Sequence, residues 1–136
     1  MSILVDTDVV LDVLLMRAGF VDSAKAIFRR VESGAVKASV CATTVTAVDY
    51  YLSRELDTAT SRGALRSLLR LFDVAAVSRA TVEAALASPM TDFDDAVLAF
   101  SAQAHAATAI VTRKLRNFES SPVRAYTPEQ WLALNP

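Results

Sequence analysis

Short apolar runs alternate with longer amphipathic stretches along the sequence, and this alternation constrains the fold more than any other feature. The apolar runs are too short for helices and are predicted to be buried strands, at 3–5, 37–41, 74–77 and 109–111, with 123–126 as a candidate fifth. Helical spacing or helix-start residues mark the segments between them, at 11–15, 21–32, 43–55, 58–72, 79–87, 92–106 and from 127 onward. The pattern predicts a three-layer α/β/α fold with a central, mainly parallel sheet of four to five strands.

The composition predicts one domain over residues 1–136. Hydrophobic residues make up 53% of the chain, which is enough for a core without disulfides or a structural metal. Cys41 is the only cysteine, which excludes an internal disulfide and predicts a reducing, cytoplasmic location. The N-terminal segment is apolar but carries Asp6, Asp8 and Asp12, so we expect neither a signal peptide nor a membrane span. The formal net charge of −1 excludes a globally basic nucleic-acid binder and still allows a local basic patch.

Acidic residues stand where the predicted strands end and the predicted helices begin. Asp6 directly follows the first strand, and residues 112–114 directly follow the strand at 109–111. Ligands of an open parallel sheet bind outside the carboxyl ends of its strands, so these two segments are expected to face one crevice. Asp95 lies at the start of a helix, and Asp49 lies in the helix after the second strand. Converging carboxylates repel each other unless a cation neutralises them, so the pattern predicts a Mg²⁺ or Mn²⁺ site that activates water against a phosphodiester.

Other polar residues near these positions have simpler structural interpretations. Asp8 is as well suited to capping the following helix as to binding a metal, and Asp92 stands at a typical helix cap position. Asp12 is expected to be a solvated helix residue, and Asp94 is expected to point to solvent. His105 is the only histidine, so a Ser-His-Asp triad or a histidine-rich zinc site has little support.

Five blocks of the sequence, in order, resemble the sequence blocks of PIN domains, in particular those of VapC-like toxin ribonucleases. The first is DTDVVLD at 6–12, similar to D-T-N-V-L-L-D, and the second is CATTVTAVD at 41–49, where hydroxyl residues precede an acid that is usually Glu. The others are DAVLA at 95–99, similar to D-A-x-x-A, IVTRKLRNF at 110–118, similar to I-V-T-R-[ND] followed by D-F, and TPEQWL at 127–132, similar to S-P-E-E-F-L. Five blocks in the right order over nearly the whole chain are fairly specific, whereas one alone would be weak.

The resemblance implies a PIN fold and a Mg²⁺- or Mn²⁺-dependent endoribonuclease that hydrolyses RNA phosphodiesters. It also implies a homodimer and, for many small members of the family, the toxin of a VapBC-type pair that a cognate antitoxin neutralises. Carried over by position, Asp6, Asp49 and Asp95 would be the catalytic and metal-binding acids, with Asp92 as a further metal ligand. The side chains that would support them through hydrogen bonds are those of Thr7, Asp8, Thr112 and Asn117.

The sequence departs from the family pattern at two positions. Asp49 is one methylene shorter than the usual Glu, and Lys114 stands where the family has Asp or Asn. Asn117 aligns with the Asp of D-F and is a candidate replacement for the missing acid. Lys114 is expected either to take part of the metal's space or to contact RNA, and together with Arg113 and Arg116 it forms the predicted patch for RNA phosphates.

Two other functions stay open from the sequence. One is a catalytically weak or inactive PIN module that binds RNA or protein without cutting, which Lys114 favours. The other is a haloacid-dehalogenase-like phosphatase, because Asp6-x-Asp8 resembles its first motif, with Asp6 as the phosphoryl-accepting nucleophile and Asp8 as the general acid. Thr112 would be the candidate for that family's hydroxyl motif. There the acidic pair comes after this motif, whereas here Asp95 precedes Thr112, so the order is wrong.

Overall fold

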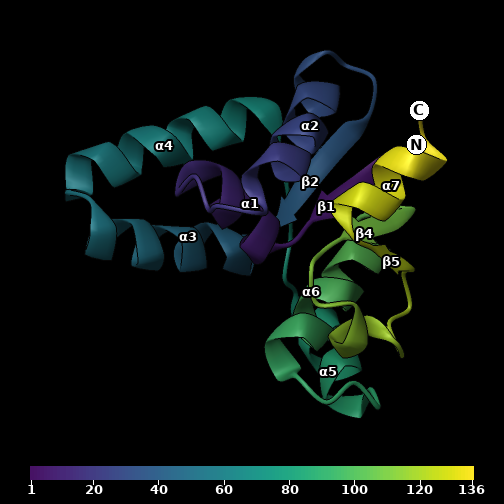
Figure 1. The fold of residues 1–136 in the computed structure, drawn as a ribbon. Coiled ribbons are helices and arrows are strands. Elements are labelled where there is room, and N and C mark those ends of the chain that lie inside the picture. Colours follow the sequence, from purple (N-terminus) through teal and green to yellow (C-terminus); the bar gives the residue numbers. More distant parts are fainter.

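A fully parallel sheet of five strands forms the centre of the protein in a computed structural model that describes residues 1–136 (Figure 1). Its spatial order is β3-β2-β1-β4-β5. The strands are β1 (Ser2–Val5), β2 (Lys37–Cys41), β3 (Asp73–Ala75), β4 (Ala109–Val111) and β5 (Ala125–Tyr126). The α/β fold class predicted from the sequence is therefore confirmed. β3 and β5 are shorter than expected, because pairing with the neighbouring strand is confined to Asp73–Ala75 and to Ala125–Tyr126.

Helices cover both faces of this sheet, as the strands' alternating side chains require. One face packs against α1 (Thr7–Leu14), α2 (Val21–Glu32), α3 (Ala42–Glu55), α4 (Thr58–Leu71) and α7 (Pro128–Leu134). The other face packs against α5 (Arg79–Ala87), α6 (Phe93–Ala104) and the 3₁₀ turn η1 (Leu115–Phe118). In β1, Ile3 and Val5 point into the first core while Leu4 points into the second. Burial on both faces explains why the strands are short continuous apolar runs.

The order of the strands creates a switch point beside β1. The chain runs from β1 outward through β2 and β3 and then crosses back to pair β4 with the opposite edge of β1. The carboxyl ends of β1 and β4 therefore lie side by side, where connections leave in opposite directions and open a crevice. Asp6 and Thr112 are the first residues after these two strands.

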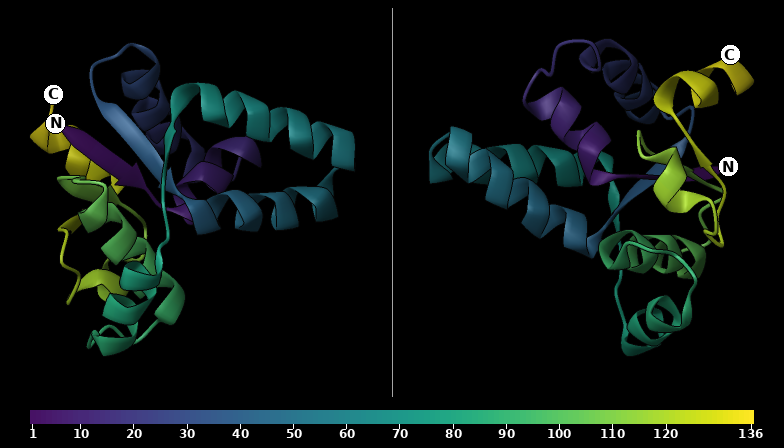
Figure 2. Two further views of the ribbon diagram at one scale, coloured as in Figure 1. Left: turned by 180° about the vertical axis from the view of Figure 1, so that it is seen from behind. Right: turned by 60° about the horizontal axis from the view of Figure 1, so that its bottom comes forward.

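Helices α3 and α4 form an antiparallel hairpin that projects away from the sheet, as the two views of Figure 2 show. Asp57 accepts a hydrogen bond from the Thr60 backbone N–H and so caps the start of α4 at the tip of the hairpin. None of the helices has the length and apolar character needed to cross a bilayer.

Candidate functional site

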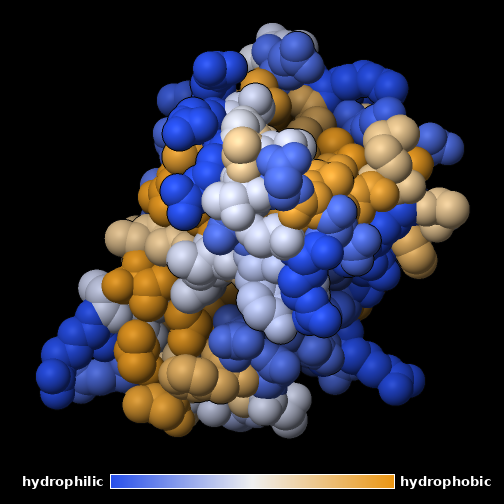
Figure 3. Space-filling model, turned by 90° about the vertical axis from the view of Figure 1, so that its left-hand side faces the viewer, coloured by the Kyte–Doolittle hydropathy of each residue, from blue (hydrophilic) through white to orange (hydrophobic).

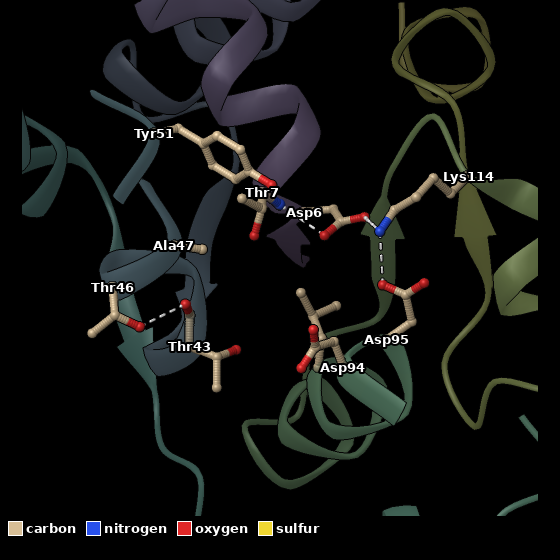
Figure 4. A pocket seen from close by; sticks show the side chains of 10 residues that line it. Asp6, Thr7, Thr43, Thr46, Ala47, Tyr51, Asp94, Asp95 and Lys114 are labelled. Carbon is tan, nitrogen blue, oxygen red and sulfur yellow. Dashed lines mark hydrogen bonds and ion pairs between the residues drawn. The ribbon is translucent and has the colours of Figure 1, made fainter. Parts of the chain in front are cut away.

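A pocket of about 500 Å³ opens at the carboxyl ends of β1 and β4 (Figure 4). Its wall combines the start of α1, one face of α3, the first turn of α6 and the residue Lys114 that follows β4. Asp6 and Asp95, which the sequence predicted to share one crevice, both line it. Asp6 is there because it directly follows β1, and Asp95 is there because α6 packs against the sheet with its first turn at the same carboxyl end.

Asp6 is fixed by both of its neighbouring segments. Its Oδ1 accepts a hydrogen bond of 2.7 Å from the backbone N–H of Thr7, so Asp6 also caps α1. Its Oδ2 accepts a hydrogen bond of 2.7 Å from the hydroxyl of Thr112. The residue is only 2% exposed, and this burial raises the pKa of its carboxyl group, an effect that Lys114 and Thr112 partly offset. Thr112 thus contacts Asp6 through its side chain and Thr7 through its backbone N–H, and the supporting roles of both stay predictions.

Asp95 lies in the first turn of α6, directed toward the same pocket. The side chain of Asp92 accepts the backbone N–H of Asp95 at 2.9 Å and caps the helix. Oδ1 of Asp95 accepts a hydrogen bond of 2.8 Å from the Lys114 ammonium, and Oδ2 accepts one of 2.8 Å from the amide of Asn117. Asn117 therefore contacts the acidic centre, whereas Asp92 is an exposed cap that does not line the pocket, which argues against the predicted role of Asp92 as a metal ligand.

Lys114 joins the two buried carboxylates. Its Nζ lies 2.8 Å from Oδ1 of Asp95 and 3.6 Å from Oδ2 of Asp6. Burial opposes the charged form of the ammonium, but the two carboxylates outweigh it and raise the pKa of Lys114 above its usual range. Of the two roles predicted for Lys114, the geometry matches the one in which the lysine takes up the space and charge of a metal.

Asp8 lies beside this centre with one oxygen unsatisfied. Its Oδ2 accepts the backbone N–H of Arg113 at 3.1 Å, while its buried Oδ1 has no hydrogen-bond partner. Burial, and then the charge of Asp6, raise the pKa of Asp8 to about 7. Asp8 is therefore held against the loop after β4, which is consistent with a supporting role.

The side chain of Arg113 points away from the pocket, toward α1. Its guanidinium donates hydrogen bonds of 2.7 and 3.1 Å to the two oxygens of Asp12 and lies over the ring of Phe20, 3.9 Å from the centroid. Asp12 is only 1% exposed, so the expectation of a solvated residue is wrong. Its charge is compensated by a residue 101 positions later, a contact that no local pattern reveals. These bonds also engage the guanidinium that was predicted to contact RNA phosphates.

Asp49 does not join the acidic centre, contrary to the prediction. Its Oδ1 accepts hydrogen bonds from Ser53 at 3.3 Å and from Ser61 of α4 at 2.8 Å. The α3 side chains that line the pocket are those of Thr43, Thr46, Ala47 and Tyr51. The two serines hold the carboxylate of Asp49 on the side of α3 that meets α4, outside this lining.

Helical spacing relates the α3 residues of the pocket to one another, but the tertiary structure decides which face of α3 meets the pocket. Thr43 follows the end of β2, and the positions one and two turns later on the same face are Ala47 and Tyr51. Thr44 points into the protein, where its hydroxyl lies 2.9 Å from that of Thr7. The remaining predicted residue, Arg116, is exposed beside η1.

The donor set of the pocket is compatible with a hard divalent cation. Mg²⁺ in proteins keeps several waters and binds through one or two carboxylates, often with substrate phosphates, and Asp6 and Asp95 provide two. However, no three acidic, histidine or cysteine side chains converge in this structure. Each oxygen of the two carboxylates already has a donor within the protein, among them Lys114. The two acids fit such an ion as ligands once the ammonium has moved.

Comparisons with known proteins agree with this architecture. A family model described as PIN domain matches residues 2–116. None of the curated proteins matches the sequence.

Solved structures are similar over nearly the whole chain. A toxin-antitoxin complex from Klebsiella pneumoniae has a chain that is 22% identical, with a TM-score of 0.70, covering 92% of this chain and 96% of that one. VapBC-1 from nontypeable Haemophilus influenzae is 13% identical, with a TM-score of 0.70 and coverages of 95% and 99%. VapBC2 from Rickettsia felis, bound to a DNA fragment from its promoter, is 12% identical, with a TM-score of 0.68 and coverages of 93% and 98%. At these identities the likeness concerns the fold.

Proposed function

The chain belongs to the PIN domain family, and from that premise we propose that it is a metal-dependent endoribonuclease of the toxin-antitoxin type. The observation that carries this proposal is the meeting of Asp6 and Asp95 in one pocket. They come from distant parts of the chain, and neither is explained by helix capping alone, because each directs an oxygen toward Lys114. Two buried acids at the switch point of a parallel sheet suit phosphodiester chemistry better than a purely structural role.

Asp6 and Asp95 would hold Mg²⁺ or Mn²⁺, which supplies an activated water and neutralises charge on the phosphate. The protein's own contribution is orientation. Thr7 and Thr112 fix both oxygens of Asp6, and Asn117 fixes one oxygen of Asp95. The Lys114 ammonium, once released from the carboxylates, reaches the pocket mouth and steadies an RNA phosphate, with the exposed Arg116 nearby.

The proposed partners are an antitoxin protein and a second copy of this chain. The three solved complexes pair related folds with antitoxins. The α3–α4 hairpin leaves large apolar side chains exposed. Figure 3 views the molecule from the side toward which the hairpin projects in Figure 1, and on this side apolar patches lie among hydrophilic ones. The exposed apolar side chains of the hairpin are Tyr50, Tyr51, Leu56 and Leu69. A cytoplasmic setting agrees with the buried free thiol of Cys41.

Cleavage of a structured RNA by the purified protein tests the enzyme proposal. We expect cleavage with Mn²⁺ or Mg²⁺ that EDTA abolishes, and a loss of about a hundredfold or more in Asp6→Asn and in Asp95→Asn, because each removes a metal ligand. Asp49→Asn is the matched control, since Asp49 faces α4, and it should cleave like the wild type. Undiminished cleavage by the Asp6→Asn, Asp95→Asn double variant would reject the ribonuclease.

A second function is a PIN module that binds RNA or protein without cutting. Two features favour it: the ammonium of Lys114 contacts both acids, and α3 contributes no carboxylate to the pocket lining. In that case the same assay shows no metal-dependent cleavage by the wild type, while the protein still retains RNA or an antitoxin in a gel-shift or pull-down experiment.

A further inference from the structure

We propose that Lys114 is a tethered counter-ion that a divalent cation has to displace from Asp6 and Asp95, so that this one residue sets the affinity of the pocket for metal. The inference deepens the proposed ribonuclease function and rests on it for its biological meaning. Its physical content, a competition between two cations for the same carboxylates, is measurable without RNA.

The contacts around the ammonium define the competition. Nζ of Lys114 is the cationic group that contacts either acid, at 2.8 Å from Asp95 and 3.6 Å from Asp6. Asp6 and Asp95 are 2% and 3% exposed, so water cannot replace a lost counter-charge as it would at the surface. A divalent ion that used these two oxygens would be only a few ångströms from the ammonium, and the repulsion between them at that distance is strong in a partly buried site.

The same contacts also explain why the ammonium can leave. Its side chain is 42% exposed, and only the shorter of its two carboxylate contacts is a hydrogen bond. The Lys114 backbone N–H is held by the hydroxyl of Thr112 at 3.0 Å, so the stem starts from a fixed point. A flexible four-carbon stem on a fixed backbone lets the ammonium swing out to solvent, while the hydrogen bonds from Thr7, Thr112 and Asn117 still hold the two acids in place.

Binding of Mn²⁺ to the full chain, measured by calorimetry or by the spin-resonance signal of the free ion, tests the competition. We compare the wild type with Lys114→Met, which keeps the length of the side chain and removes its charge. We expect Mn²⁺ to bind Lys114→Met at least about tenfold more tightly, because a repelling charge has gone. Lys37→Met is the matched control, because Lys37 begins β2 at the opposite end of the sheet, and its affinity should equal that of the wild type.

Equal Mn²⁺ affinities in the wild type and Lys114→Met, or no binding by either folded protein, would overturn the inference. Circular dichroism verifies folding, and if Lys114→Met fails to fold, Lys114→Gln takes its place, since its amide can still donate to Asp95. A rise in the melting temperature with Mn²⁺ should likewise be larger in the variant. Tighter Mn²⁺ binding without RNA cleavage by any variant would uphold the competition and reject the ribonuclease, so the two proposals fail separately.

Discussion

Arg113 and Lys114 are neighbours in the chain, yet each serves a different carboxylate site. The side chain of Arg113 points toward α1, where it donates hydrogen bonds to both oxygens of Asp12 and stacks on Phe20. Lys114 turns toward the pocket and holds two acids, each through a single oxygen. The planar fork of arginine suits a permanent two-point contact, whereas the ammonium of lysine is a point charge on a flexible stem. The ion pair of Arg113 with Asp12 is a structural contact, whereas the contacts of Lys114 with Asp6 and Asp95 are exchangeable.

Loss of the ion pair between Arg113 and Asp12 should have the largest effect, on the stability of the fold. Arg113→Ala leaves the 1%-exposed carboxylate of Asp12 without its main partner, and we expect a loss of about 3 kcal/mol or more in the free energy of unfolding. Urea denaturation measures it. Arg116→Ala, an exposed neighbour, is the control and should change stability by less than about 0.5 kcal/mol. A loss below about 1 kcal/mol in Arg113→Ala would mean that the pair is not structural.

A carboxylate added from α3 to the pocket, which Asp94 lines besides Asp6 and Asp95, should give the next largest effect. Ala47→Glu, added to Lys114→Met, directs an acid from α3 at Asp6 and Asp95, and we expect Mn²⁺ to bind about tenfold more tightly than in Lys114→Met alone. The same added charge at an exposed position outside the pocket, Tyr50→Glu, should leave the affinity unchanged. An equal gain in both variants would show a general charge effect rather than ligation.

The exchange of lysine for arginine sharpens the comparison directly. Lys114→Arg places a guanidinium in the pocket, where it can donate more hydrogen bonds to Asp6 and Asp95 than the ammonium does. We expect Mn²⁺ affinity to fall by about threefold to tenfold relative to the wild type, because the competing cation is held through more hydrogen bonds. The calorimetric titration used for Lys114→Met measures it. A stronger affinity in Lys114→Arg would contradict the idea that the two cations compete.

The smallest effect is expected on the far side of α3. Asp49→Ala leaves the buried hydroxyl of Ser61 without its acceptor, which should cost about 1 kcal/mol in the free energy of unfolding. Mn²⁺ affinity should stay at the wild-type value, because Asp49 faces α4 rather than the pocket. A weakened metal affinity in Asp49→Ala would return this residue to the acidic centre.

The sequence predicted the parts of the site that depend on local position. Asp6 was recognised because it ends an apolar strand, and Asp95 because it lies beyond the cap of its helix. It was also clear from the sequence that Lys114 departs from the family pattern. The strand-end rule alone places Asp6 at the carboxyl end of the sheet, whereas the place of Asp95 also depends on how α6 packs against the sheet.

Two parts of the site depend on tertiary structure and were missed. The role of Asp49 rested on its place in a sequence block, but the carboxylate bonds Ser61 of α4 and lies outside the pocket lining. The burial of Asp12 follows from its pairing with Arg113, far away in the chain. Neither the rotation of α3 about its axis nor a long-range ion pair leaves a local pattern in the sequence.

The position of β1 has a consequence for how the protein is made. It is the central strand, but the ribosome produces it first, and its neighbour β4 begins only at Ala109. A nascent chain that stops short of that residue contains Asp6 without the hydroxyl of Thr112 or the ammonium of Lys114. Translation therefore supplies both acids of the pocket before their counter-charge, because Lys114 comes 19 residues after Asp95 in the chain.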